Sequence, residues 1–293
     1  MKNFISLLRV KSWVKNGFLF LPAVFSLHLF EKPALYSLIA GALTFCFASS
    51  FIYILNDIKD AKEDAMHPRK SKRPIASGAV SKSFALAVAF LLLGLVLAAY
   101  WIFHFSFAYF AVVWVYLFLN LAYTFGLKNL PLVELIIVSV NFVLRVLAGC
   151  FLLMVAPSQW ILVVTFFLSF LLVVVKRRSE IKQLQANAFI HRQALQAYSV
   201  PFLNSLVYIS STITISAYLL YSIDAQVVKA LQTDKIMYST LFVLLGIFRL
   251  IQITEHDLYE GEGDPTTLLF KDRFLQLIIL SWVSYLICIL YVF

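Results

Sequence analysis

A short acidic segment is the part of the sequence best suited to chemistry. It places carboxylates and one carboxamide at closely spaced positions: Asn56, Asp57, Asp60, Glu63 and Asp64. In a continuous helix, at about 100° per residue, these side chains would share one arc of about 120°. Like charges on one helix face repel each other, whereas Mg²⁺ prefers carboxylate oxygens and substrate phosphates. The spacing therefore predicts a magnesium–phosphate site, with a solvated charged turn as the alternative. In this interpretation Asp57, Asp60 and Asp64 are catalytic, and together with Asn56 they are the metal ligands.

Basic residues follow the acidic segment directly. Residues 67–78 read H-P-R-K-S-K-R-P-I-A-S-G, a run of cations interrupted by turn residues, in which Arg69 and Arg73 are candidate phosphate ligands. Carboxylates that hold Mg²⁺ beside cations that hold anions form the arrangement expected around a diphosphate. Membrane topology and contact with lipid headgroups are the alternative explanation for the basic run alone.

Membrane-spanning helices are the elements that must position these residues. Of the 293 residues, 62% are hydrophobic and 13% are charged, which excludes a soluble globular enzyme and a disordered chain. Apolar runs of about 20 residues, each long enough for the hydrocarbon core, recur along the chain. We expect an all-α integral membrane bundle of nine transmembrane helices, forming a single domain over residues 1–293. The expected spans are 14–30, 35–56, 83–103, 106–126, 131–154, 158–176, 201–223, 236–254 and 273–292.

The loops between these spans predict the orientation of the chain. Lys and Arg outnumber Asp and Glu by 24 to 15, and most of the cations fall in loops on the side of the N-terminus. The positive-inside rule then places the N-terminus and the acidic segment on the cytoplasmic face of the cytoplasmic (inner) membrane. Because this topology explains the net charge of +9, no nucleic-acid partner is expected.

The pattern N-x-x-x-D-x-x-x-D, formed by Asn56, Asp60 and Asp64, precedes the segment R-P-I-A-S-G at 73–78. These patterns and the nine expected helices resemble the UbiA superfamily of intramembrane prenyltransferases over essentially the whole chain. The resemblance implies a UbiA-like bundle in which this motif holds Mg²⁺ and a prenyl diphosphate. In the general family a second motif, D-x-x-x-D after the sixth helix, shares that task.

The chain departs from the general family plan after the sixth span. The corresponding segment contains Lys176, Arg177, Arg178 and Glu180 but no aspartate, so we expect the cations to contact phosphate directly. With W-V-K-N at 13–16 and E-G-E-G-D-P-T at 260–266, the chain resembles the decaprenyl-phosphate phosphoribosyltransferase branch of the family. That resemblance implies Mg²⁺-dependent transfer of 5-phosphoribose from phosphoribosyl diphosphate to a polyprenyl phosphate, with release of pyrophosphate.

Further side chains are candidates for contact with the substrates. An arginine deep in the fifth span is costly and marks a functional site by default, with a structural hydrogen-bond hub as the alternative. Aromatic and basic residues beside the cytoplasmic loops are candidates too, although such residues are ordinary interfacial anchors elsewhere. These candidates are Lys15, Asn16, Tyr123, Lys128, Asn141, Arg145 and Tyr198. The acidic loop 255–264 is interpreted as a lid, as a second cation contact or as a solvated segment.

Two other functions are weighed against this one. A UbiA-type prenyltransferase would join a prenyl diphosphate to a small aromatic acceptor, but the missing second aspartate pair argues against it. A transporter or lipid-binding protein would show repeats and polar groups near the bilayer midplane, and no clear repeat is visible. The expected partners are therefore phosphoribosyl diphosphate, a polyprenyl phosphate and membrane lipids, and homo-oligomerisation is left open.

Overall fold

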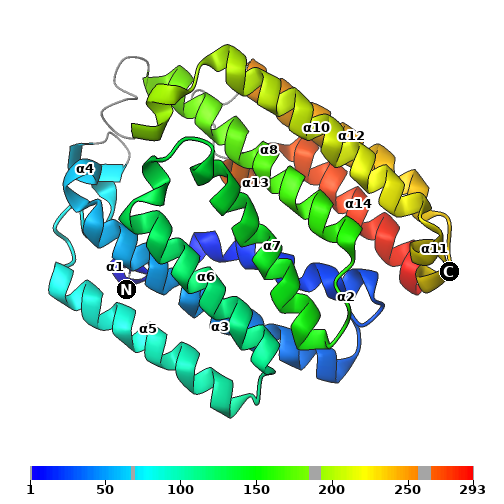
Figure 1. Ribbon diagram of the computed structural model, residues 1–293, viewed down its shortest axis with the longest axis horizontal. Helices are drawn as coiled ribbons and strands as arrows, with labels where there is room; N and C mark the ends of the chain where they lie inside the picture. Colours follow the sequence, from blue (N-terminus) through cyan, green and yellow to red (C-terminus); the bar gives the residue numbers. More distant parts are fainter. Residues whose placement is uncertain (1, 67–69, 185–192, 257–264, 293) are drawn as a thin grey trace. The chain divides into compact units, whose positions relative to one another are not determined.

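Long apolar helices make up most of the protein. The computed structural model describes residues 2–66, 70–184, 193–256 and 265–292, and every regular element in these ranges is helical (Figure 1). Eight described helices are long and apolar enough to cross a membrane. They are α3 (Lys32–Lys59), α5 (Lys82–Ile102), α6 (Phe107–Phe125), α7 (Val133–Leu153), α8 (Gln159–Leu184), α10 (Val200–Ile223), α12 (Ile236–Glu255) and α14 (Arg273–Tyr291). The prediction of an all-α membrane protein is confirmed, and these helices match the second to ninth expected spans to within a few residues, except that α8 continues past residue 176.

Short helices occupy the N-terminal segment and the loops. Those labelled η are 3₁₀ helices, which have three residues per turn. The short helices are α1 (Lys2–Leu7), η1 (Val10–Phe20), α2 (Leu21–Phe25), α4 (Ala61–Met66), η2 (Lys70–Lys72), η3 (Leu127–Asn129), η5 (Gln193–Ala197), α11 (Ala225–Leu231) and α13 (Pro265–Lys271).

The chain packs as two compact units. In the first, residues 1–23, 28–130 and 144–156, helix α3 packs against α5, α6 and η1. In the second, residues 24–27, 131–143 and 157–293, helix α8 packs against α10, α10 against α12, and α12 against α14. The acidic segment lies wholly within the first unit. The single domain expected over the whole chain stays a prediction.

The first expected span, 14–30, is not one α-helix. The chain instead forms the 3₁₀ helix η1 followed by the short helix α2. Residues three apart share one edge of a 3₁₀ helix, and on this edge Trp13 donates from Nε1 to Ser50 Oγ at 3.0 Å, while Asn16 and Leu19 are buried. Tertiary contacts with α3 thus favour a three-residue period here, which hydropathy alone does not reveal. We call residues 2–20 the N-terminal arm.

Close packing of the N-terminal arm on α7 depends on Gly149. A methyl group at this position would overlap the backbone carbonyl oxygen of Leu19. We expect Gly149→Ala to lower the free energy of unfolding by about 1–3 kcal/mol, because two backbones would have to separate. Gly94→Ala in α5 is the matched control, since its added Cβ meets no atom within 4 Å and alanine favours a helix. Thermal unfolding in detergent measures both variants, and equal effects would contradict this packing.

Candidate active site

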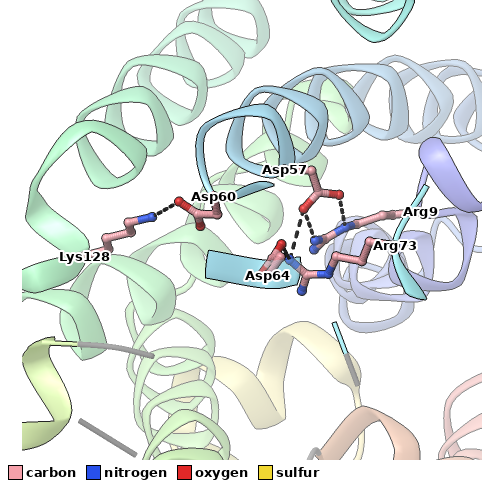
Figure 2. A network of polar contacts seen from close by, with 6 residues as sticks. All are labelled: Arg9, Asp57, Asp60, Asp64, Arg73 and Lys128. Atoms are coloured by element: carbon pink, nitrogen blue, oxygen red, sulfur yellow. Dashed lines mark hydrogen bonds and ion pairs between the residues drawn. The ribbon is translucent and has the colours of Figure 1, made fainter. Parts of the chain in front are cut away.

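The acidic segment bends at Asp60 instead of continuing as one helix. Helix α3 ends at Lys59, and Asp60 has a ψ of 6°, far from the value of about −42° in an α-helix. Helix α4 then begins at Ala61. The single arc of carboxylates expected from the spacing is therefore wrong. Asp57 and Asp64 point toward each other, whereas Asp60 points toward another part of the first unit (Figure 2).

Two arginines hold the converging carboxylates. Arg9 donates from Nε to Asp57 Oδ2 at 3.0 Å, and its Nη2 pairs with Oδ1 of the same carboxylate (Figure 2). Arg73 Nη1 lies between the two acids, 3.1 Å from Asp57 Oδ1 and 2.5 Å from Asp64 Oδ2. The side chains of Asp57 and Asp64 are only 4% and 5% exposed. Ion pairs of this kind compensate the loss of solvation that burial imposes on a carboxylate.

Asp60 is bound by a cation from a different element. Lys128 in η3 places its Nζ 2.5 Å from Asp60 Oδ1, and Lys59 Nζ donates to the carbonyl oxygen of Thr124 at 2.6 Å. These two contacts join the end of α3 to η3 and to the end of α6. The structure thus brings Lys128, a predicted substrate ligand, to the acidic segment.

Arg9 is the residue at this site that sequence reasoning missed. Its backbone has a φ of 50°, in the left-handed region that residues other than glycine rarely adopt. Ser50 Oγ donates to the carbonyl oxygen of Leu8 at 2.7 Å, and the Arg9 guanidinium lies 5.0 Å from the ring centroid of Tyr53. Such a conformation persists only where surrounding contacts enforce it. In the sequence, only its charge distinguishes Arg9, because its carboxylate partner Asp57 lies 48 residues away.

A second buried polar group in the first unit centres on Arg145. Its Nε donates to Asn16 Oδ1 at 2.8 Å, and its Nη2 donates to the Tyr116 hydroxyl at 3.4 Å. The guanidinium also lies 5.0 Å from the Tyr116 ring centroid and 5.3 Å from that of Phe45. These contacts form a hub that joins η1, α3, α6 and α7. A role of Arg145 and Asn16 in substrate binding stays a prediction.

Arg177 forms a buried ion pair within the second unit. Its guanidinium contacts both carboxylate oxygens of Glu134 at 2.8–3.1 Å, and Nη1 donates to Glu180 Oε2 at 2.7 Å. The Arg177 and Glu134 side chains are 4% and 0% exposed. Arg177, a predicted phosphate ligand, is therefore bound to two carboxylates, and its pair with Glu134 anchors the start of α7 to α8.

Arg178, like Arg177, is bound to other side chains of the protein, mainly at the end of α12. Its Nη1 donates to Asn204 Oδ1 at 3.0 Å and pairs with Glu255, and its Nη2 donates to Thr254 Oγ1 at 2.7 Å. The side chain is fully buried. These contacts tie α8 to α10 and α12, and phosphate binding by Arg178 stays a prediction.

The remaining candidates occupy varied surroundings. Tyr198 is buried, and its hydroxyl accepts a hydrogen bond from the backbone N–H of Leu132 at 2.7 Å, just before α7. Asn141 is buried too. The half-buried candidates are Lys15, Asn56, Tyr123 and Lys176. Arg69 and most of the acidic loop, residues 257–264, lie outside the described residues.

The converging carboxylates fit a magnesium ion that is shared with a substrate phosphate. Within the described ranges, no three His, Cys, Asp or Glu side chains meet as a complete protein metal centre would require. Asp57 and Asp64 do meet, at a single nitrogen of Arg73. Mg²⁺ in phosphate-handling sites is commonly held by one or two carboxylates, and waters and phosphates complete its octahedron.

Fold and site together define a helical membrane protein that carries a cluster of paired acidic and basic side chains beside the end of α3. A family model described as the UbiA prenyltransferase family matches residues 18–274. The chain belongs to the UbiA prenyltransferase family, which confirms the prediction of a membrane-embedded transferase.

Two similar enzymes and one solved structure extend this assignment. The decaprenyl-phosphate phosphoribosyltransferase of Corynebacterium glutamicum is 30% identical, over 99% of this chain and 87% of its own length. The enzyme of the same name from Mycolicibacterium smegmatis is 30% identical, over 97% of this chain and 91% of its own. A UbiA homologue from Archaeoglobus fulgidus, solved with GPP and Mg²⁺, has a TM-score of 0.72 at 20% identity and covers 99% of this chain and 100% of its own. That structural likeness establishes the UbiA fold.

Proposed function

We propose that this protein transfers 5-phosphoribose from phosphoribosyl diphosphate to a decaprenyl-type polyprenyl phosphate and releases pyrophosphate. The observation that carries the proposal is the 30% identity to two enzymes named for this reaction over nearly the full chain. The site agrees with the phosphate groups that these two substrates carry. One pair of converging carboxylates serves one diphosphate, and several cations lie close to it.

The residues divide into a metal-holding set and a phosphate-holding set. Asp57 and Asp64 would hold Mg²⁺, with Asn56 and Asp60 beside them, and the bound ion supplies charge that neutralises the departing pyrophosphate. The cations Arg9, Arg73 and Lys128, which contact these acids, would bind phosphate oxygens. The UbiA homologue solved with Mg²⁺ supports the choice of metal.

The acceptor phosphate needs alignment more than activation. A phosphate monoester has a second pKa near 6 and is largely dianionic at neutral pH, so its oxygen attacks the anomeric carbon without a dedicated general base. The bond from that carbon to pyrophosphate breaks as the new bond forms. The protein contributes by holding the two substrates in line. The distribution of Lys and Arg among the loops supports a site on the cytoplasmic face.

A transfer assay tests the proposal. The purified protein in detergent is mixed with Mg²⁺, labelled phosphoribosyl diphosphate and a polyprenyl phosphate, and we expect a ribosylated lipid together with pyrophosphate. Omission of the lipid phosphate or the metal is the control. Transfer from a prenyl diphosphate to a small aromatic acceptor, with no product from the ribosyl donor, would instead identify a prenyltransferase of the general family type.

A further inference from the structure

Arg73 occupies the place that a shared metal ion would take. Its Nη1 bridges Asp57 on α3 and Asp64 on α4, at 3.1 Å and 2.5 Å from their carboxylate oxygens (Figure 2). A cation that is held by both of these acids must therefore displace the guanidinium from between them. The bridging nitrogen makes Arg73 an internal competitor for the metal.

The charges of the cluster set the conditions for that displacement. Among the described residues, the carboxylates of Asp57, Asp60 and Asp64 are matched one for one by Arg9, Arg73 and Lys128. A divalent ion without a diphosphate would add two positive charges to a cluster whose charges already balance. It would also leave the displaced arginine without a counter-ion in partly buried surroundings, which is unfavourable. A metal that arrives with a diphosphate brings the anion that the displaced cations need.

We propose that Arg73 is an exchangeable internal cation that makes metal binding at this site dependent on the diphosphate. Without a diphosphate its guanidinium neutralises Asp57 and Asp64 and disfavours the free metal. With a metal–diphosphate complex, the guanidinium transfers to phosphate oxygens, whose geometry it matches with paired N–H donors. This inference rests on the proposed function only in requiring that a diphosphate-bearing donor binds at these aspartates.

The backbone around Arg73 supports a movement confined to its side chain. The N–H of Ser77 donates to the Arg73 carbonyl oxygen and the N–H of Val80 to that of Pro74, both at 2.9 Å. Pro74 and Ile75 are buried, whereas the Arg73 side chain is 27% exposed. The turn therefore fixes the main chain, and the long side chain is left to exchange partners.

Binding of Mn²⁺, followed by its electron paramagnetic resonance signal, tests the exchange directly. Inorganic pyrophosphate is the probe, because it is present in a ribosyl donor and in a prenyl donor alike. In the wild-type protein we expect pyrophosphate to tighten Mn²⁺ binding by at least ~10-fold, within the usual range of coupling between two ligands. In Arg73→Gln we expect Mn²⁺ alone to bind at least several-fold tighter than in wild type, and most of the enhancement by pyrophosphate to disappear.

In Arg73→Gln the affinity for Mn²⁺ alone is expected to rise while the enhancement by pyrophosphate falls. This combination distinguishes exchange of Arg73 from a purely structural role. Lys62→Gln removes one charge from an exposed lysine on α4 and is the matched control, expected to change neither quantity. Arg73→Lys, which keeps the charge, covers the case in which Arg73→Gln does not fold. We expect Arg73→Lys to bind Mn²⁺ alone as weakly as the wild type does and to lose part of the enhancement by pyrophosphate.

Unchanged or weaker binding of Mn²⁺ alone by folded Arg73→Gln would overturn the proposal. Equal thermal stabilisation of the wild type by Mg²⁺ with and without pyrophosphate would overturn it too. Neither outcome depends on which donor the transfer assay identifies.

Discussion

Replacing Asp64 by Asn is expected to lower the rate of phosphoribosyl transfer by at least ~100-fold, which corresponds to a few kcal/mol of transition-state stabilisation. Asp64 supplies one of the two carboxylates that converge on a single cation position. An amide keeps the shape of this side chain but not its negative charge, so the metal and the departing pyrophosphate would be held poorly. Initial rates of ribosylated lipid formation at saturating Mg²⁺ measure the effect.

Glu63→Gln is the matched control for this prediction. Glu63 is the neighbouring acid on α4, but it is exposed, so we expect the rate to stay close to that of the wild type. Thermal unfolding in detergent shows whether each variant is folded. If the folded double variant Asp60→Asn with Asp64→Asn kept a near-normal rate, the assignment of the metal ligands would have to be abandoned.

Replacing Arg177 by Ala is expected to lower the free energy of unfolding by about 3–5 kcal/mol, because one partner of a buried ion pair is removed. Its guanidinium makes three contacts of 2.8–3.1 Å with Glu134, whose side chain is fully buried. Without Arg177, the Glu134 carboxylate would lose its bidentate counter-ion in surroundings that solvate charge poorly. Thermal unfolding at neutral pH measures the loss.

A double replacement distinguishes the ion pair from a direct role in phosphate binding. Arg177→Met combined with Glu134→Gln removes both charges and keeps similar volumes, so we expect much of the lost stability to return. If Arg177→Ala instead unfolded at the wild-type temperature and raised the KM for phosphoribosyl diphosphate, Arg177 would be a substrate ligand, as its place in the sequence suggested.

The amino-acid sequence by itself determined the class of the protein and identified the acidic segment at which we propose that its chemistry takes place. Apolar runs of sufficient length cross a bilayer whatever their neighbours are, and eight of them form long helices. Asp57 and Asp64 were identified from their local spacing, although the helix that was expected to carry all the acids on one arc ends at Lys59. The family resemblance needed this stretch together with R-P-I-A-S-G at 73–78 and the expected series of apolar spans.

Only the tertiary structure decided which charges meet. Arg9 reaches Asp57 across 48 residues, Lys128 reaches Asp60 across 68, and Arg178 reaches Glu255 across 77. The 3₁₀ geometry of the N-terminal arm likewise depends on contacts with α3 and on the close approach at Gly149. Hydropathy and spacing are local properties of the chain, whereas a buried charge takes its partner from whichever segment the packed helices bring beside it. The sequence therefore does not distinguish a basic residue that anchors a helix at the membrane surface from one that neutralises an aspartate or contacts a phosphate.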